Sequence, residues 1–256
     1  MVFEKRKYDK IEFKESYSVR RPCEFNCKIE IKGEQLEEVR EFKYLGSVLC
    51  KYDTMVSEIR ERTMLGRREI GELGSVLNGR GMSMEVKRNL RNSIVVPTLT
   101  YGSEVWKWNV AEQSKIRAVE MIYLRAAIGV TRMDRVRNDE VYERCGMAEG
   151  LPGVNCGVVN WVNRNALKWY GHVRRIPEER MAKKVYQSKV SGEPGRGRPP
   201  MTWECKVEQY LKERVGGGLR SLEAAKVACS DRKLWRPFCH GHPPGWELPG
   251  GTKCRR

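Results

Sequence analysis

The sequence predicts a mainly α protein, in which a short β-hairpin near the N-terminus precedes a helical bundle and a helical C-terminal region. Two observations predict this class. Apolar side chains recur every three to four residues over most of the chain after residue 54, whereas alternation with a period of two is confined to residues 27–49. Clusters of glycine and proline separate the periodic stretches, which indicates several helices of moderate length.

The N-terminal part holds the only predicted strands. Residues 1–26 mix charges of both signs with few apolar positions, so we expect a poorly ordered leader there. The hairpin is predicted from alternating residues in Cys27–Ile31, a turn at Gly33 and a second strand over Leu36–Leu49.

Two helices are expected after the hairpin. An apolar stripe over residues 56–77 ends at Asn78-Gly79-Arg80-Gly81, which predicts the first. Ser83 can cap the second, and Pro97 then bends or stops it. Its inner face is predicted to carry Val86, Leu90 and Ile94.

The clearest helix signal begins at Asn109. This residue and Glu112 form a capping box, and Gly129 ends the helix. Residues 138–146 predict a short helix after it. The side chains expected to face inward from the long helix are Ile116, Val119, Tyr123 and Ala126.

Further helices are expected over residues 158–170, 202–215 and 221–235. In the first of these, Val158, Val162, Ala166 and Trp169 share one side. The predicted organisation of the whole chain is a leader (1–26), a hairpin with a helical domain (27–150), a basic helical connector (151–186), a flexible basic linker (187–200), a C-terminal helical pair (201–238) and an irregular tail (239–256).

The charge predicts a polyanionic partner. The net charge is +16 and the pI is about 9.6. Residues 1–150 carry 28 basic and 24 acidic side chains, a net +4, while residues 151–256 carry 21 basic and 9 acidic ones, a net +12. Lysine and arginine on phosphates release condensed counterions, so nucleic acid is the expected partner, bound mainly by the second part.

Nine cysteines without a repeated short spacing favour reduced thiols and an intracellular protein, in the nucleus or the cytoplasm. No apolar run approaches the length of a membrane span, so no membrane partner is expected.

Five short motifs, in a fixed order, point to a family. They are Phe42-Lys43-Tyr44-Leu45-Gly46, Tyr101-Gly102-Ser103-Glu104-Val105-Trp106, Trp169-Tyr170-Gly171-His172-Val173, Arg196-Gly197-Arg198-Pro199-Pro200 and Trp203. Together with Asp231–Arg236 they resemble the region downstream of the palm in non-LTR, LINE-type retrotransposon reverse transcriptases. The resemblance covers about residues 27–238. It implies a thumb-like bundle and the segment after it, with Tyr44, Leu45, Gly46, Tyr101, Gly102, Trp106, Trp169, Trp203 and Trp235 as structural landmarks.

The resemblance also implies that the polymerising carboxylates lie upstream of Met1. The residues agree, because phosphoryl transfer needs clustered carboxylates for divalent ions and no two aspartates are adjacent here. We therefore expect no catalytic residue and no cofactor in this chain, since the divalent metal would belong to the absent palm. An upstream polymerase portion is a possible partner, and residues 1–26 would then be a truncated palm edge.

Thumb helices lie along the template–primer duplex, so the resemblance makes Arg60, Arg67 and Arg68 candidates for binding RNA, DNA or an RNA–DNA hybrid. Arg62, with Gly66 and Gly71 for close approach, belongs to the same helix. The alternative is a solvated face that nearby glutamates balance.

A second basic group follows the Trp-rich helix. Its arginines and lysines can contact phosphate, and the imidazole of His172 can do so or stack on a base; a cap on the negative end of the helix is the alternative role for the histidine. The candidates are His172, Arg174, Arg175, Lys183 and Lys184.

Arg196-Gly197-Arg198 resembles the core of an AT-hook, which lies in the minor groove of A·T-rich DNA. Glu193 and a thin basic flank depart from that pattern, and a plain cationic linker is the alternative.

Two other groups favour structural interpretations. Cys239, His240, His242 and Cys254 do not have a usual zinc spacing, so no metal site is expected. Trp106 and Trp108 could stack bases, but packing between helices is the favoured interpretation.

The leading functional hypothesis is a nucleic-acid-binding fragment of a retrotransposon RNA-directed DNA polymerase that does not polymerise alone. Two alternatives stay open. The chain could be a retained DNA- or RNA-binding adaptor that uses residues 151–256, or one part of a longer active reverse transcriptase polyprotein.

Overall fold

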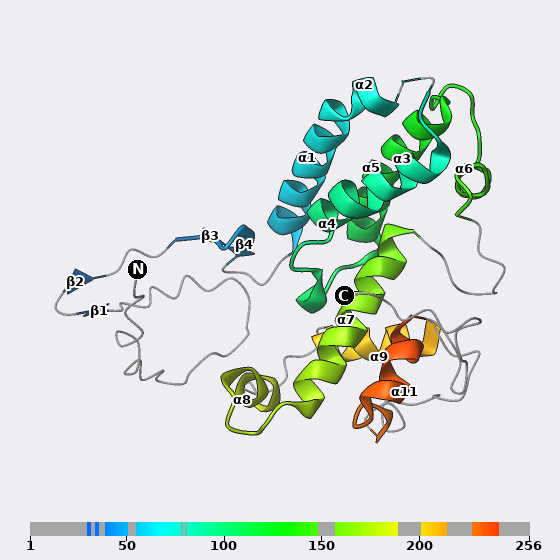
Figure 1. Ribbon diagram of the computed structural model, residues 1–256. Helices are drawn as coiled ribbons and strands as arrows, with labels where there is room; N and C mark the ends of the chain where they lie inside the picture. The colour runs from blue at the N-terminus through cyan, green and yellow to red at the C-terminus, as the bar shows by residue number, and fades with distance from the viewer. Residues whose placement is uncertain are drawn as a thin grey trace, which may run out of the picture.

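The computed structural model describes residues 30–31, 34–35, 39–50, 55–77, 79, 81–147, 157–188, 201–213 and 227–240 (Figure 1). These residues form a mainly helical protein with short antiparallel hairpins before the first helix, which confirms the predicted fold class. The predicted leader, most of the predicted linker and nearly all of the predicted tail lie outside the described residues.

Two short hairpins replace the single one predicted. Strands β1 (Glu30–Ile31) and β2 (Glu34–Gln35) pair with each other, and β3 (Glu41–Tyr44) pairs with β4 (Ser47–Cys50). The predicted continuous strand over Leu36–Leu49 was wrong, because the chain reverses at Leu45-Gly46. Both turn residues have positive φ, 48° and 85°, as a two-residue turn that matches the twist of paired strands requires.

The first long helix is the predicted one, divided into α1 (Val56–Glu72) and α2 (Gly74–Leu77). It is followed by α3 (Met84–Leu90), the π-helical turn η1 (Arg91–Val95) and α4 (Val96–Leu99). The Oγ of Ser83 accepts a bond from the backbone N–H of Val86, which confirms the predicted cap. The wide π turn ends two residues before Pro97, which has no N–H to donate to the previous turn.

The predicted inner face of this second helix was wrong. Val86 is 45% exposed, while Lys87, Arg91 and Val95 are buried. The two cations can lie inside because their charged ends have partners: the Nζ of Lys87 donates to the carbonyl of Ala127 at 2.8 Å, and Arg91 pairs with Glu120. Buried charges with such partners escape most of the usual cost of burial.

Helix α5 (Val110–Ile128) follows the short 3₁₀ turn η2 (Ser103–Val105) and precedes α6 (Asn138–Arg144). Its capping box is present as predicted, and Gly129 ends it with a φ of 73°. With α1 and α7 it encloses the first hydrophobic core, which contains Ile59, Leu99, Trp106, Trp108, Ile116, Val119, Tyr123, Leu124 and Val162.

Helix α7 (Val158–Arg175) connects this core to a second one, and Figure 1 shows it running from the upper helices down to α8 (Met181–Gln187), α9 (Trp203–Glu213) and α11 (Arg232–Cys239). The predicted end of this helix at Tyr170 was wrong by five residues. The second core contains Ala166, Leu167, Tyr170, Val207, Tyr210, Leu211, Cys229, Trp235, Phe238 and Cys239.

The helix predicted over residues 221–235 is also corrected. The chain turns at Cys229 and Ser230, and α11 begins after Asp231, whose carboxylate accepts a 2.7 Å bond from the backbone N–H of Lys233. A carboxylate at this position caps a new helix and stabilises its positive end.

Candidate nucleic-acid interface

The first two landmark motifs meet in space although they lie 56 residues apart. The hydroxyl of Tyr101 donates a 2.8 Å hydrogen bond to the carbonyl of Leu45 at the tip of the β3–β4 hairpin. Gly102 has a φ of 71°, and a Cβ there would lie 3.0 Å from the Oγ of Ser47. The hairpin turn therefore packs on the corner between α4 and η2, and glycine suits that corner in both conformation and size.

Buried charges on α1 hold the same turn. The guanidinium of Arg62 bonds to the carbonyl of Gly46 and to the carboxylate of Glu58, and it lies 5.0 Å from the centre of the Tyr101 ring. Glu58 also accepts a 2.6 Å bond from the backbone N–H of Val48. Arg62 therefore has a structural role, contrary to its expected place on a nucleic-acid face.

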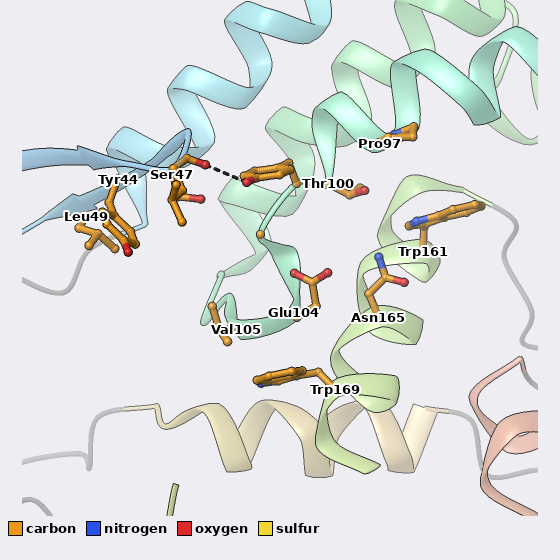
Figure 2. A pocket seen from close by; sticks show the side chains of 13 residues that line it. Tyr44, Ser47, Leu49, Pro97, Thr100, Glu104, Val105, Trp161, Asn165 and Trp169 are labelled. Atoms are coloured by element: carbon orange, nitrogen blue, oxygen red, sulfur yellow. Dashed lines mark hydrogen bonds between the residues drawn. The ribbon is translucent and has the colours of Figure 1, made fainter. Parts of the chain in front are cut away.

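A groove of about 830 Å³ opens between this hairpin, the α4–η2 corner and α7 (Figure 2). Most of the surface that lines it is apolar, and several of its side chains are half-exposed or more. The lining residues are Tyr44, Leu45, Ser47, Leu49, Pro97, Thr100, Tyr101, Gly102, Glu104, Val105, Trp161, Asn165 and Trp169.

One wall of the groove is a stripe on α7. Trp161, Asn165 and Trp169 follow one another at intervals of four residues, and all three line the groove. His172 continues the stripe, with its ring centre 5.3 Å from that of Trp169. The guanidinium of Arg164 lies 4.0 Å from the ring centre of Trp161, so a cation flanks the aromatic surface.

The opposite wall carries Glu104, and Figure 2 shows its carboxylate and the amide of Asn165 on facing sides of the groove. Aromatic faces stack on bases, and amide and carboxylate groups accept bonds from base amino groups. A carboxylate disfavours phosphate inside the groove, whereas Arg164, Lys168 and His172 on α7 suit phosphates at its edge. This arrangement can hold unpaired bases.

Trp161 and Asn165 were not predicted from the sequence. The signal that could have found them is the four-residue spacing to Trp169 on a helix whose buried side is already complete with Val158, Val162 and Ala166. Trp169, predicted on one side with Val158, Val162 and Ala166, is only partly buried and lines the groove.

The arginines predicted on α1 are on the surface. Arg60, Arg67 and Arg68 are exposed. Arg68 has weak contacts with Glu69 at 3.7 Å and Glu72 at 3.8 Å, the balancing acids of the alternative hypothesis. Gly66 does not serve approach to nucleic acid, because a Cβ there would lie 2.4 Å from the Cδ2 of Leu99; its small size serves packing inside the bundle.

The second predicted basic group divides into two kinds. His172 and Lys184 are exposed, and Arg174 is partly exposed. Lys183 is buried, and its Nζ donates to the carbonyls of Val173 at 3.2 Å and Arg174 at 2.8 Å at the end of α7. Cations at that end stabilise the helix.

Arg175 contacts the second core instead, since its Nη1 donates to the carbonyl of Cys229 at 2.7 Å. Arg196 and Arg198 lie outside the described residues.

The last landmarks meet around Tyr170. Its ring lies 6.1 Å from that of Trp203 and 6.0 Å from that of Trp235. The indole of Trp203 donates to the carbonyl of Glu104, and the buried Trp106 lies 5.4 Å from Trp108 in the first core. The predicted packing role of Trp106 and Trp108 is therefore confirmed.

Of the residues considered for zinc, Cys239 is buried in the second core, while His242 and Cys254 lie outside the described part of the chain. Among the described residues, no three histidine, cysteine or acidic side chains gather in a way that could hold a metal ion. None of the described helices is both long and apolar enough to cross a membrane.

The fold and the groove define a mainly helical protein with two hydrophobic cores and an apolar groove between its hairpin, the α4–η2 corner and α7. Comparison with known proteins gives evidence on the origin of the sequence. The chain is similar to an uncharacterized transposon-derived protein of Caenorhabditis elegans, with 26% identity over 202 residues, which cover 78% of this chain and 70% of the relative. This similarity suggests a transposon-derived origin. No protein-family profile matches the chain, and no solved structure matches it significantly.

Proposed function

We propose that this chain is the thumb and post-thumb part of a LINE-type reverse transcriptase, which binds nucleic acid and does not polymerise by itself. Three observations support the proposal: the order of the landmark motifs, the similarity to a transposon-derived protein, and a net charge of +16. The landmark residues also contact one another in the fold: Tyr101 contacts the Leu45-Gly46 turn, and Tyr170 lies beside Trp203 and Trp235.

The observation that carries binding is the α7 stripe. Trp161 and Trp169 lie on the side of α7 that lines the groove, while the other side of the helix fills both cores. Both indoles are partly exposed, so a ligand in the groove would contact the parts that Arg164 and His172 leave uncovered. Bases of an unpaired strand would stack there, while its phosphates meet the cations of α7. The exposed Arg60 and Arg67 on α1 offer a second, sequence-independent contact to a duplex backbone.

The test is a binding series with purified protein and three labelled ligands: single-stranded RNA, an RNA–DNA hybrid and an A·T-rich DNA duplex, each over a range of salt concentrations. Trp169→Ala should weaken binding of the single strand by about 1–3 kcal/mol, or roughly 5- to 150-fold, because one stacked base is lost. Phe42→Ala is the matched control, since Phe42 is an exposed aromatic residue that does not line the groove. Equal weakening by both variants would remove the groove from the proposal.

The ligand preference distinguishes the thumb hypothesis from the adaptor hypothesis. The net charge of +12 over residues 151–256 favours the adaptor hypothesis. Preference for the hybrid supports a thumb. Preference for the A·T duplex that disappears in an Arg196→Ala/Arg198→Ala double variant supports a retained DNA-binding adaptor. No binding of any ligand at low salt would contradict both.

A further inference from the structure

A second pocket, of about 380 Å³, lies between α1, α5 and the loop that joins α5 to α6. Four of the nine residues that line it are arginines: Arg67 from α1, Arg125 from α5, and Arg132 and Arg135 from the loop. The other lining residues are Ala118, Met121, Ile122, Val136 and Asn138. Of these nine residues, only Arg67 was predicted from the sequence to bind nucleic acid.

The geometry of the pocket is held by its own residues. The Nη2 of Arg125 donates to the carbonyl of Val136 at 3.0 Å and to the Oδ1 of Asn138 at 2.8 Å, which fixes the guanidinium beside the loop. The Nε of Arg125 is buried and has no hydrogen-bond partner in the described part of the chain. A buried donor without a partner is rare, so the hydrogen-bonding capacity of this guanidinium is not fully used within the described residues.

The loop is a defined turn. The carboxylate of Asp134 accepts bonds from the backbone N–H of Thr131 at 2.6 Å and from its hydroxyl at 2.8 Å. These bonds, the backbone one first, hold the pKa of Asp134 below its usual range. The carboxylate of Asp134 is thus directed toward Thr131. Arg135 adopts a φ of 53°, a left-handed conformation that is uncommon for arginine and that often accompanies function.

The arginines of this pocket form no ion pairs with the described residues. Within the described ranges, none of the four arginines has a carboxylate within ion-pair distance. Arg67, Arg132 and Arg135 are exposed, so each guanidinium can turn toward a bound anion. Four like charges around one concave site repel each other, and an anion would relieve that repulsion.

We propose that this pocket binds a phosphate group of a nucleic-acid strand. Planar guanidinium forks match the oxygens of phosphate in pairs, which is why clustered arginines favour phosphate over other anions. The apolar wall of Ala118, Met121 and Ile122 suits the sugar that follows the phosphate. The inference rests on the proposed function, because only nucleic-acid binding makes a strand the source of the phosphate.

The test compares two double variants that remove the same charge. Arg132→Gln/Arg135→Asn changes the pocket, with asparagine chosen because it tolerates the left-handed conformation of residue 135. Arg117→Gln/Arg137→Gln changes two exposed arginines on the same helix and loop that do not line the pocket. Binding of a short RNA–DNA hybrid is measured over a salt series, and thermal unfolding is measured with inorganic phosphate against chloride at equal ionic strength.

We expect the pocket variant to lose at least about tenfold in affinity for the hybrid and to lower the salt slope by about 1 to 2, while the control loses less than about threefold. Phosphate should raise the melting temperature of the wild type and of the control, but not of the pocket variant. Equal losses in both variants would overturn the proposal and leave the proposed function standing. If the wild type bound no hybrid, the proposed function would fail. If phosphate then still raised the melting temperature of the wild type and the control but not of the pocket variant, the pocket would be a site for free phosphate.

Discussion

The indole N–H of Trp108 donates a 2.8 Å hydrogen bond to the hydroxyl of Tyr210, and both side chains are almost fully buried. Trp108 belongs to the first hydrophobic core and Tyr210 to the second, so this bond joins the two across 102 residues. Helix α7 also contributes to both cores. This bond and α7 together fix the position of α9 relative to the first core.

Replacing Tyr210 with Phe tests how much this hydrogen bond stabilises the protein. The change leaves the buried Trp108 N–H without its acceptor, and we expect a loss of about 1–3 kcal/mol in the free energy of unfolding. Urea unfolding followed by circular dichroism measures it. Tyr44→Phe, on the exposed face of the hairpin, is the control and should leave the urea midpoint unchanged. Equal midpoints for the wild type and Tyr210→Phe would show that the Trp108–Tyr210 bond does not stabilise the protein.

A second prediction concerns Gly171. A Cβ there would lie 2.1 Å from the Nε1 of Trp235, whose indole donates to the carbonyl of Leu167 in the same helix. Gly171→Ala should therefore cost about 1–3 kcal/mol through overpacking. Gly71→Ala, on α1 with no atom within 4 Å of the added carbon, should instead stabilise the protein by about 0.5–1 kcal/mol. Thermal unfolding of both variants distinguishes packing from helix propensity.

The third prediction concerns the buried carboxylate of Glu120. It bonds to Arg91, to the hydroxyl of Tyr142 at 2.8 Å and to the backbone N–H of Val158 at 3.0 Å. Glu120→Ala leaves the guanidinium buried without a counterion, so the loss should be about 3–5 kcal/mol. Glu140→Ala breaks the exposed pair with Arg144 and should cost at most about 1 kcal/mol. Similar midpoints in urea for these two variants would contradict the assignment.

The fourth prediction is a loss of stability at alkaline pH. Burial raises the pKa of Tyr123 and of Tyr170 to about 12, above the ordinary value of 10.0. A raised pKa means that the folded state holds the proton longer, so this stabilisation is complete below pH 10 and is lost as the pH rises from 10 to 12. Melting temperatures and tyrosinate absorbance over that range measure it. Ionisation of Tyr123 and Tyr170 at the ordinary pKa while the protein stays folded would contradict the prediction.

Thiol reactivity provides a fifth test. Cys205 is exposed, whereas Cys229 is buried and burial raises its pKa to about 12. Since the thiolate is the reactive species, native protein should be alkylated at Cys205 long before Cys229. Mass spectrometry of peptides after a timed reaction assigns each site. Rapid modification of Cys229 without unfolding would show that the second core is open in solution.

Local signals predicted many of the helices. The capping box at Asn109 and Glu112 and the cap at Ser83 are in place because such bonds involve neighbours in sequence. The errors lie where distant residues decide. The helix that contains Gly171 continues to Arg175, and Trp235 fills the space beside Gly171, a contact that nothing within the helix predicts.

The candidate sites show the same division. The exposure of Arg60, Arg67 and Arg68 followed from the apolar stripe on the other side of their helix, whereas Arg62 on the same helix is buried. Its burial depends on the turn at Gly46, whose carbonyl it bonds, and on Glu58. The apolar stripe predicts the exposed arginines but not the contact of Arg62 with a distant turn.

The sequence by itself determined the helical class, several helix boundaries, the basic second half and the order of the landmark motifs, because these depend on local periodicity, caps and composition. Tertiary structure alone decided that Tyr101 contacts Leu45, that Trp161 and Trp169 line an open groove, and that arginines from two helices and a loop share one pocket. The physical reason is that such sites depend on which surfaces remain uncovered after the helices pack, and packing joins residues that are far apart in the chain.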